Sequence, residues 1–217
     1  MPEQLTETEA RIIGSLVEKQ LTTPEYYPLT MNALVNACNQ KNNRDPVVSF
    51  SESTVSSAIE GLRDRNIVYV YYGSTSRVPK YKHMLPTYFE LEPAEVAVMA
   101  VMLLRGPQTL GELRTRTERM HGFSSLGEVQ ETLDGLMRRE DPLVAKLPVL
   151  AGQKEARFAH LLSGEIDMDA LAAHVAAPRR SSGDPERMEK LEAEVTALRG
   201  EIDELKATFE EFRKQFE

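Results

Sequence analysis

The chain has 217 residues, of which 41% are hydrophobic and 28% charged, and its formal net charge is −8. These proportions are ordinary for a soluble globular protein, and the length allows one large or two small domains. The longest apolar run, Val96 to Leu104, is too short to span a bilayer, and the N-terminus lacks a secretory signal. One cysteine cannot form an internal disulfide, so we expect a cytoplasmic protein without a membrane segment.

The negative charge is unevenly distributed. Residues 1–86 carry nine basic and nine acidic side chains, whereas residues 166–217 carry eight and thirteen. No segment has the strong positive excess that makes counterion release dominate nucleic-acid binding, which argues against strong, non-specific affinity for DNA.

The first predicted element is a helix that begins after Thr6. Thr6 can cap it, and Glu9, three residues later, completes a capping box. Ile13, Leu16 and Val17 supply its buried stripe.

Residues 22–64 predict a helix-turn-helix. Met31–Cys38 has the periodicity of a short amphipathic helix, and residues 39–46 are turn formers that cannot continue it. A second helix is expected to begin near Ser51, with one apolar face made by Val55, Ala58, Ile59 and Leu62. Residues 67–72 and 80–85 are rich in β-formers and predict an antiparallel hairpin, so the whole segment is interpreted as a winged helix.

The pattern then repeats. A helix start at Leu91–Val96 has Pro93 in its first turn, and Val129–Leu136 matches Val55–Leu62 in its apolar positions and its glycine. Residues 143–147 and 157–161 predict a second hairpin. The predicted fold is therefore mainly α with small antiparallel β-hairpins, in two tandem winged-helix domains at residues 1–88 and 89–164.

Residues 165–186 predict a short helix and a linker, and residues 187–217 predict a coiled-coil helix. Apolar residues alternate at spacings of three and four over four heptads: Met188, Leu191, Val195, Leu198, Ile202, Leu205, Phe209, Phe212 and Phe216. In a parallel pair, the flanking charges would face opposite charges, namely Arg187 with Glu192, Glu194 with Arg199, and Glu201 with Lys206. We expect a homodimer; the alternative is an amphipathic helix that packs back on its own chain.

No pattern of catalytic or metal-ligating residues is visible, so an enzyme, a metal and a cofactor are not expected. Cys38 lies on the apolar side of its predicted helix, which favours packing over nucleophilic chemistry. His121 and His174 have no partner at a metal-ligand spacing. His83 and His160 occupy matching positions in the two predicted hairpins, which points to a shared structural role.

A helix-turn-helix places the exposed side of its second helix in the major groove of DNA. The predicted contacts are Asn42, Asn43 and Arg44 in the turn, Ser53, Ser56 and Ser57 on the helix, and Arg77, Lys80 and Lys82 on the hairpin. Glu60 and Asp64 also face outward and do not suit phosphates. The second unit turns Gln130, Glu131, Asp134 and Arg138 outward, which suits DNA less well.

Each of these features has another interpretation. The turn asparagines can serve only to adopt left-handed backbone geometry, and the hairpin cations can be ordinary solvated charges. The acidic outward faces favour a different class of function, an adaptor that binds proteins and has no DNA affinity.

Two long segments resemble the signature of the YceH-like family of bacterial proteins. The segments read EKQLTTPEYYPLTMNALVNACNQKNNRDPV and FSESTVSSAIEGL, and the resemblance covers about residues 5–164. It implies tandem winged-helix domains and implies no activity, cofactor or catalytic residue. The heptad tail lies outside the resemblance.

Overall fold

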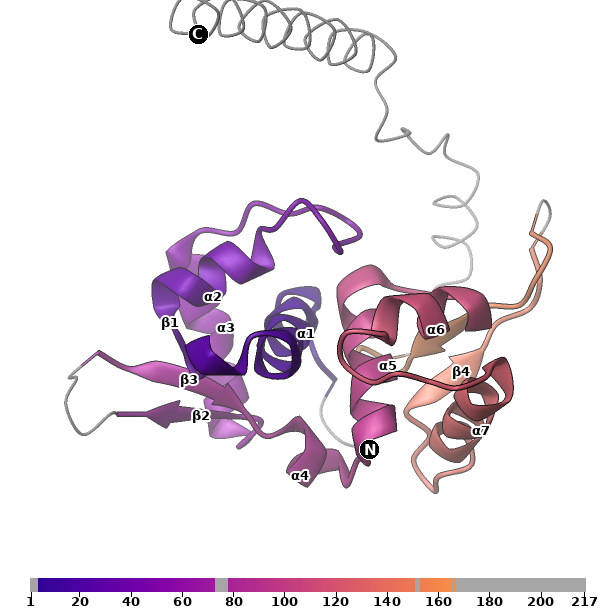
Figure 1. Cartoon of the computed structure of the whole chain (residues 1–217). Helices are drawn as coiled ribbons and strands as arrows, with labels where there is room; N and C mark the ends of the chain where they lie inside the picture. The colour runs from indigo at the N-terminus through magenta and orange to yellow at the C-terminus, as the bar shows by residue number, and fades with distance from the viewer. Residues whose placement is uncertain (1–3, 73–77, 151–152, 165, 167–217) are drawn as a thin grey trace, which may run out of the picture. The chain divides into compact units, whose positions relative to one another are not determined.

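A computed structural model describes residues 4–72, 78–150, 153–164 and 166 (Figure 1). Residues Met1–Ile166 form one compact unit. The predicted linker of residues 165–186 and the predicted coiled coil of residues 187–217 lie outside the described residues, apart from Ile166. The described part is mainly helical with small antiparallel strand pairs, which confirms the predicted fold class.

The first half of this unit contains three helices and a small sheet. Its elements are α1 (Glu7–Thr22), a 3-10 turn (Pro24–Tyr26), β1 (Leu29–Thr30), α2 (Met31–Cys38), α3 (Glu52–Asp64), β2 (Val68–Tyr71) and β3 (Lys80–His83). The capping box predicted for α1 is present, since Thr6 Oγ1 accepts from Glu9 N and the Glu9 carboxylate accepts from Thr6 N. The α2 helix has the predicted bounds, and Ser51 caps α3 as expected.

The second half repeats this order. Its elements are α4 (Leu85–Phe89), α5 (Pro93–Arg105), α6 (Leu110–Thr117), α7 (Leu126–Met137), β4 (Val144–Lys146) and β5 (Phe158–His160). The short α4 was not predicted. Leu85 was assigned to a strand by its β-forming neighbours, but it begins a helix because Pro86 fits a first turn and cannot donate to a sheet.

The strand pairs have equivalent registers in the two halves. Strands β2 and β3 pair antiparallel with Val68 opposite His83, and β4 pairs with β5 with Val144 opposite His160. The sheet of the first half has a third strand, β1, on the other side of β3. In the second half a single antiparallel bridge between Gln108 and Phe158 takes the corresponding place, just before α6.

A partly buried ion pair also recurs in both halves. Glu9, in the first turn of α1, pairs with Arg65 at the end of α3, and a Cβ atom on Gly61 would lie 3.1 Å from the Glu9 carboxylate. Glu95, in the first turn of α5, pairs with Arg139 after α7 at 2.8 Å. Gly135 faces that carboxylate as Gly61 faces Glu9. The repeated helix, glycine and ion pair support the interpretation of the chain as an internal duplication.

The two halves share one interior. In Figure 1, α1 lies between α2 and α3 on one side and α5 on the other. All nine residues from Val96 to Leu104 of α5 are buried, so this apolar run is a core helix covered on all sides. Gly14 allows a close approach of α1 and α5, because a Cβ atom there would lie 2.8 Å from Leu104 Cγ. None of the helices in the described ranges has the length and apolarity needed to cross a bilayer.

Candidate nucleic-acid interface

The outer face of α3 is the first part of the predicted interface. Val55, Ile59 and Leu62 are buried against the core, which turns Ser53, Ser57, Glu60 and Asp64 into solvent. These orientations agree with the prediction from periodicity. Ser56 is only half-buried at the edge of the helix. The serine hydroxyls therefore lie in the N-terminal part of this face and the carboxylates of Glu60 and Asp64 in its C-terminal part, where they lower the affinity for phosphate.

The serines at the start of α3 are already hydrogen-bonded to one another. Ser51 Oγ accepts from Thr54 N at 3.1 Å and lies 2.8 Å from Ser53 Oγ. The hydroxyl of Ser53 is thus held at the exposed N-terminal turn of the helix, where backbone N–H groups point outward. An anion at this position would be favoured by the helix dipole.

Arg44 is buried, so its predicted phosphate contact is wrong. Its side chain has no exposed surface, and both guanidinium Nη atoms bond to the Glu18 carboxylate at 3.0 and 2.7 Å. The same guanidinium donates to the Ala37 carbonyl at 2.9 Å. Arg44 therefore fixes the turn between α2 and α3 onto α1. Sequence reasoning placed it outside because charged residues in polar turns are usually solvated.

Arg11 and Asn39 hold the same turn. Arg11 donates to the Cys38 and Pro46 carbonyls at 3.3 and 2.6 Å, and burial lowers the pKa of its guanidinium. The Asn39 side chain exchanges two hydrogen bonds with the backbone of Phe50, which closes the turn before α3. The turn is therefore a rigid support for α3.

The two predicted asparagine contacts differ in their surroundings. Asn43 has a φ of 58°, in the left-handed region that asparagine tolerates well. Its Oδ1 atom also accepts from Arg105 Nη1 at 3.0 Å, so it links the turn to α5. Asn42 is exposed next to it and remains a candidate contact.

The hairpin β2–β3 carries the clearest nucleic-acid signal. Residues directly opposite each other share a face, and the register places Tyr69 opposite Lys82 and Tyr71 opposite Lys80. The tyrosines are 63% and 48% exposed. The opposite face packs inward through Val68 and His83. The exposed face of β2–β3 thus combines two aromatic rings with two cations.

The lysines of this face were predicted as contacts and the tyrosines were not. The alternation of valine and tyrosine from Val68 to Tyr71 could have identified them, because a strand of period two exposes every second residue. Arg77, the third predicted cation of the hairpin, lies outside the described residues.

The outer face of α7 is already engaged in local contacts. Gln130 Nε2 donates to Asp134 Oδ1 at 2.7 Å, and Arg138 pairs with the same carboxylate at 3.6 Å. Glu131 is exposed between them. This arrangement agrees with the expectation that the second half suits DNA less well than the first.

The histidines and the cysteine serve the interior. Burial lowers the pKa of His83 to about 4, and Nδ1 of this ring accepts from Leu85 N. Burial also lowers the pKa of His160 to about 4 at the matching position of the second half. Cys38 is fully buried, and burial raises the pKa of its thiol. His174 lies outside the described residues. Within the described ranges, no three His, Cys, Asp or Glu side chains gather as a metal ion would require.

Comparisons with known proteins identify one family. Residues 5–153 match the family described as "Protein of unknown function, DUF480". A UPF0502 protein of Pelobacter propionicus is 49% identical over 217 residues, covering 98% of each chain. UPF0502 proteins of Geobacter sulfurreducens and Vibrio atlanticus are each 50% identical, covering 98% and 95% of this chain and 98% and 97% of their own lengths. The similarity extends through the tail beyond the matched family segment.

Proposed function

This chain belongs to the UPF0502 family, and from the exposed side chains of its first half we propose that it binds double-stranded DNA there. The observation that carries the proposal is the exposed face of β2–β3, on which Tyr69 lies opposite Lys82 and Tyr71 opposite Lys80. Lysines contribute phosphate contacts, and tyrosines contribute hydrogen bonds to the backbone or stack on exposed bases.

The arrangement of elements supports the same proposal. In each half three helices run into a strand pair, α1 to α3 before β2–β3 and α5 to α7 before β4–β5, which is the order of a winged helix. In that interpretation α3 enters the groove and β2–β3 contacts the flanking backbone. The supporting residues on α3 are Ser53 and Ser57, with Asn42 in the preceding turn. A regulatory role in transcription would follow from DNA binding of this kind.

Binding of labelled genomic fragments tests the proposal in the full chain. The variant Lys80→Ala with Lys82→Ala removes two phosphate contacts, so we expect the slope of log affinity against log salt to fall by about two. The matched control is Lys146→Ala with Lys154→Ala, which removes two exposed lysines from the second half. Equal losses in both variants, or no binding by the wild type at about 50 mM salt, would contradict the proposal.

A second function, a protein-binding adaptor, is supported by the outer face of α3. Glu52, Glu60 and Asp64 are all exposed there, and a basic partner would complement them. Affinity purification with nuclease treatment separates the two functions. Retention of a stoichiometric basic protein by the wild type, with its loss on Glu60→Gln and Asp64→Asn, would favour the adaptor.

A further inference from the structure

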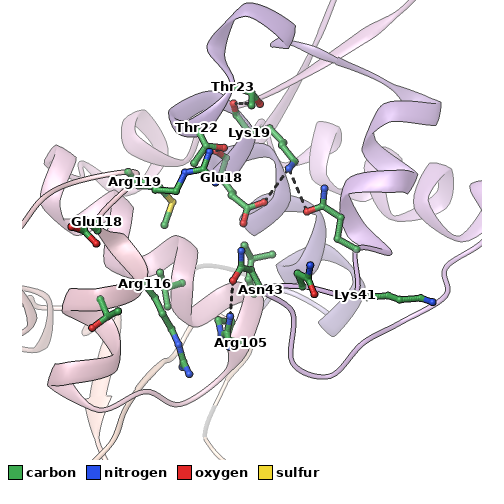
Figure 2. Close-up of a pocket in the computed structure, with 16 residues that line it drawn as sticks. Glu18, Lys19, Thr22, Thr23, Lys41, Asn43, Arg105, Arg116, Glu118 and Arg119 are labelled. Carbon is green, nitrogen blue, oxygen red and sulfur yellow. Dashed lines mark hydrogen bonds and ion pairs between the residues drawn. The ribbon is translucent and has the colours of Figure 1, made fainter. Parts of the chain in front are cut away.

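A basic groove lies between the two halves, away from the exposed face of β2–β3 that carries the proposed DNA binding (Figure 2). The end of α1 and the turn after α2 form one wall, and the ends of α5 and α6 form the other. Its volume is about 850 Å³, within the range of roughly 300–1,000 Å³ that small-molecule sites occupy. This volume suits a small molecule.

The lining has an excess of positive charge although the chain is acidic. Five basic side chains meet two acidic ones: Lys19, Lys41, Arg105, Arg116 and Arg119 against Glu18 and Glu118. The Glu18 carboxylate is also bound by Arg44 from the interior. The C-termini of three helices add about half a negative charge each. That total is smaller than the excess of two positive charges that remains when Lys41, which extends away from the other cations, is left out, so the groove remains positive.

Three arginines supply most of this charge. Arg105 Nη1 bonds Asn43, while its Nε atom is buried without a hydrogen-bond partner among the described residues. Burial lowers the pKa of Arg105, and the nearby positive charge of Arg116 lowers it further. Arg119 is exposed on the same wall, and the described residues provide it with no ion pair.

The side chains are arranged to bind more than one anionic group. Arg116 is held by Glu112 at 3.3 Å, and Lys19 is held by Gln40 at 3.3 Å and Glu18 at 3.5 Å. In Figure 2, Arg119 lies toward Thr22 and Arg105 lies at Asn43, so the cations reach the groove from separate places. Lys41 extends away from the others. Guanidinium groups bind phosphate oxygens in bidentate fashion, and cations at separate places suit a ligand with more than one phosphate better than a ligand with one anionic group.

We propose that this groove is a binding site for a small molecule carrying two or more phosphate groups. The site goes beyond the proposed DNA binding; it shares only Asn42, at its edge, with the residues proposed for that function. Because Arg105 also holds Asn43, the bound ligand would contact the residue that connects the second half to the turn before α3. The ligand would therefore stabilise the position of α3 relative to α5.

Titration calorimetry of the full chain with inorganic tripolyphosphate tests the proposal. We expect binding by the wild type, with a dissociation constant that rises at least tenfold in Arg116→Gln with Arg119→Gln. The control, Arg63→Gln with Arg138→Gln, removes two exposed arginines from α3 and the end of α7 and should leave the constant unchanged. The single variant Arg119→Glu should also raise the dissociation constant. Because Arg119 is exposed, this substitution should not disturb folding, so it serves as a check if the double variant misfolds.

Three results would overturn the proposal. The first is the absence of measurable tripolyphosphate binding by the wild type at concentrations up to about 1 mM. The second is an equal loss in the groove variant and the control. The third is that Arg116→Gln with Arg119→Gln binds tripolyphosphate as tightly as the wild type and loses affinity only for double-stranded DNA. The variant Lys80→Ala with Lys82→Ala should retain tripolyphosphate binding, so failure of the DNA proposal and failure of this one give different results.

Discussion

At the scale of single residues, buried cations fix the turn that precedes α3. Arg44 and Arg11 place two guanidinium groups under this turn, where they bond to backbone carbonyls and to Glu18. Although burial alone would raise the pKa of Glu18, the hydrogen bonds and charge of Arg44 lower it. A buried pair of this kind adds little net stability over apolar packing, but removal of one partner leaves an uncompensated charge.

The variant Arg44→Ala is therefore expected to lower the free energy of unfolding by about 3 kcal/mol, since among the described residues Glu18 keeps only Lys19 at 3.5 Å and the Ala37 carbonyl loses its donor. Arg44→Lys should recover only part of this, because an ammonium group cannot bond both carboxylate oxygens in the same geometry. Denaturant unfolding measures both changes. Arg63→Ala, on the exposed face of α3, should stay within about 0.5 kcal/mol of the wild type.

The buried histidines make stability depend on pH. The pKa of His83 is about 4 in the folded chain, below its unfolded value of about 6.5, so the unfolded state binds more protons between these values. The free energy of unfolding has its full value above about pH 6.5 and decreases as the pH drops toward 4. We expect the wild type to lose on the order of 1–2 kcal/mol between pH 7 and pH 5 from this residue.

His83→Asn, which keeps an acceptor near Leu85 N, should reduce the loss of stability between pH 7 and pH 5. His160 should contribute in the same direction, because its pKa is also lowered to about 4 by burial. Thermal melting at the two pH values measures the effect. The carboxylates with lowered pKa values, Glu18, Glu112 and Glu128, titrate below this window. An identical pH dependence in the wild type and in His83→Asn would contradict the interpretation.

At the scale of elements, the contact of α1 with α5 joins the two halves. The helices approach closely at Gly14, where an added Cβ atom would meet Leu104 Cγ at 2.8 Å and Leu103 Cβ at 3.1 Å. These atoms lie near the backbone of α5 and cannot move aside without a shift of the helix. The close packing of α1 against α5 therefore requires a small residue at position 14.

Gly14→Ala is expected to destabilise the chain despite the better helix propensity of alanine. Overpacking costs typically about 1–3 kcal/mol, whereas alanine gains about 1 kcal/mol over glycine in a helix. The control is Gly111→Ala in α6, where no atom lies within 4 Å of the new Cβ and stability should stay equal or rise. Denaturant unfolding compares them. A Gly14→Ala variant as stable as Gly111→Ala would show that α1 and α5 separate easily.

At the scale of the whole molecule, the number of chains decides how the proposed DNA contacts act. Two weak contact surfaces in one dimer would bind together through their effective concentration. The heptad seam from Met188 to Phe216 is the predicted dimerisation element. It lies outside the described residues, so pairing of two chains stays a prediction.

Light scattering of the full chain tests the dimer. Leu198→Asp with Leu205→Asp places charges at two core positions of the heptad, and we expect a dimer to become a monomer. Ala193→Asp with Ala207→Asp introduces the same charges at outer positions and should leave the dimer intact. A wild-type monomer at all accessible concentrations would favour a helix that packs on its own chain.

The sequence by itself determined the longer helices, the two strand pairs and their repetition, but not the short elements β1 and α4. Periodicity placed α2 and α3, capping residues placed the start of α1, and β-forming runs placed both strand pairs, because each signal depends only on neighbours along the chain. It also gave the outward side of α3, since the apolar face fixes the opposite one.

Only the tertiary structure decided which polar residues face solvent and which meet across the halves. From the sequence, Arg44 is predicted to be exposed in a turn. In the structure it pairs in the interior with Glu18, which lies 26 positions before it. The groove is formed by α1, α5 and α6, and none of these segments carries a local signal for it. Such contacts depend on the packing of segments distant in the sequence, which residue patterns within one helix or strand do not specify.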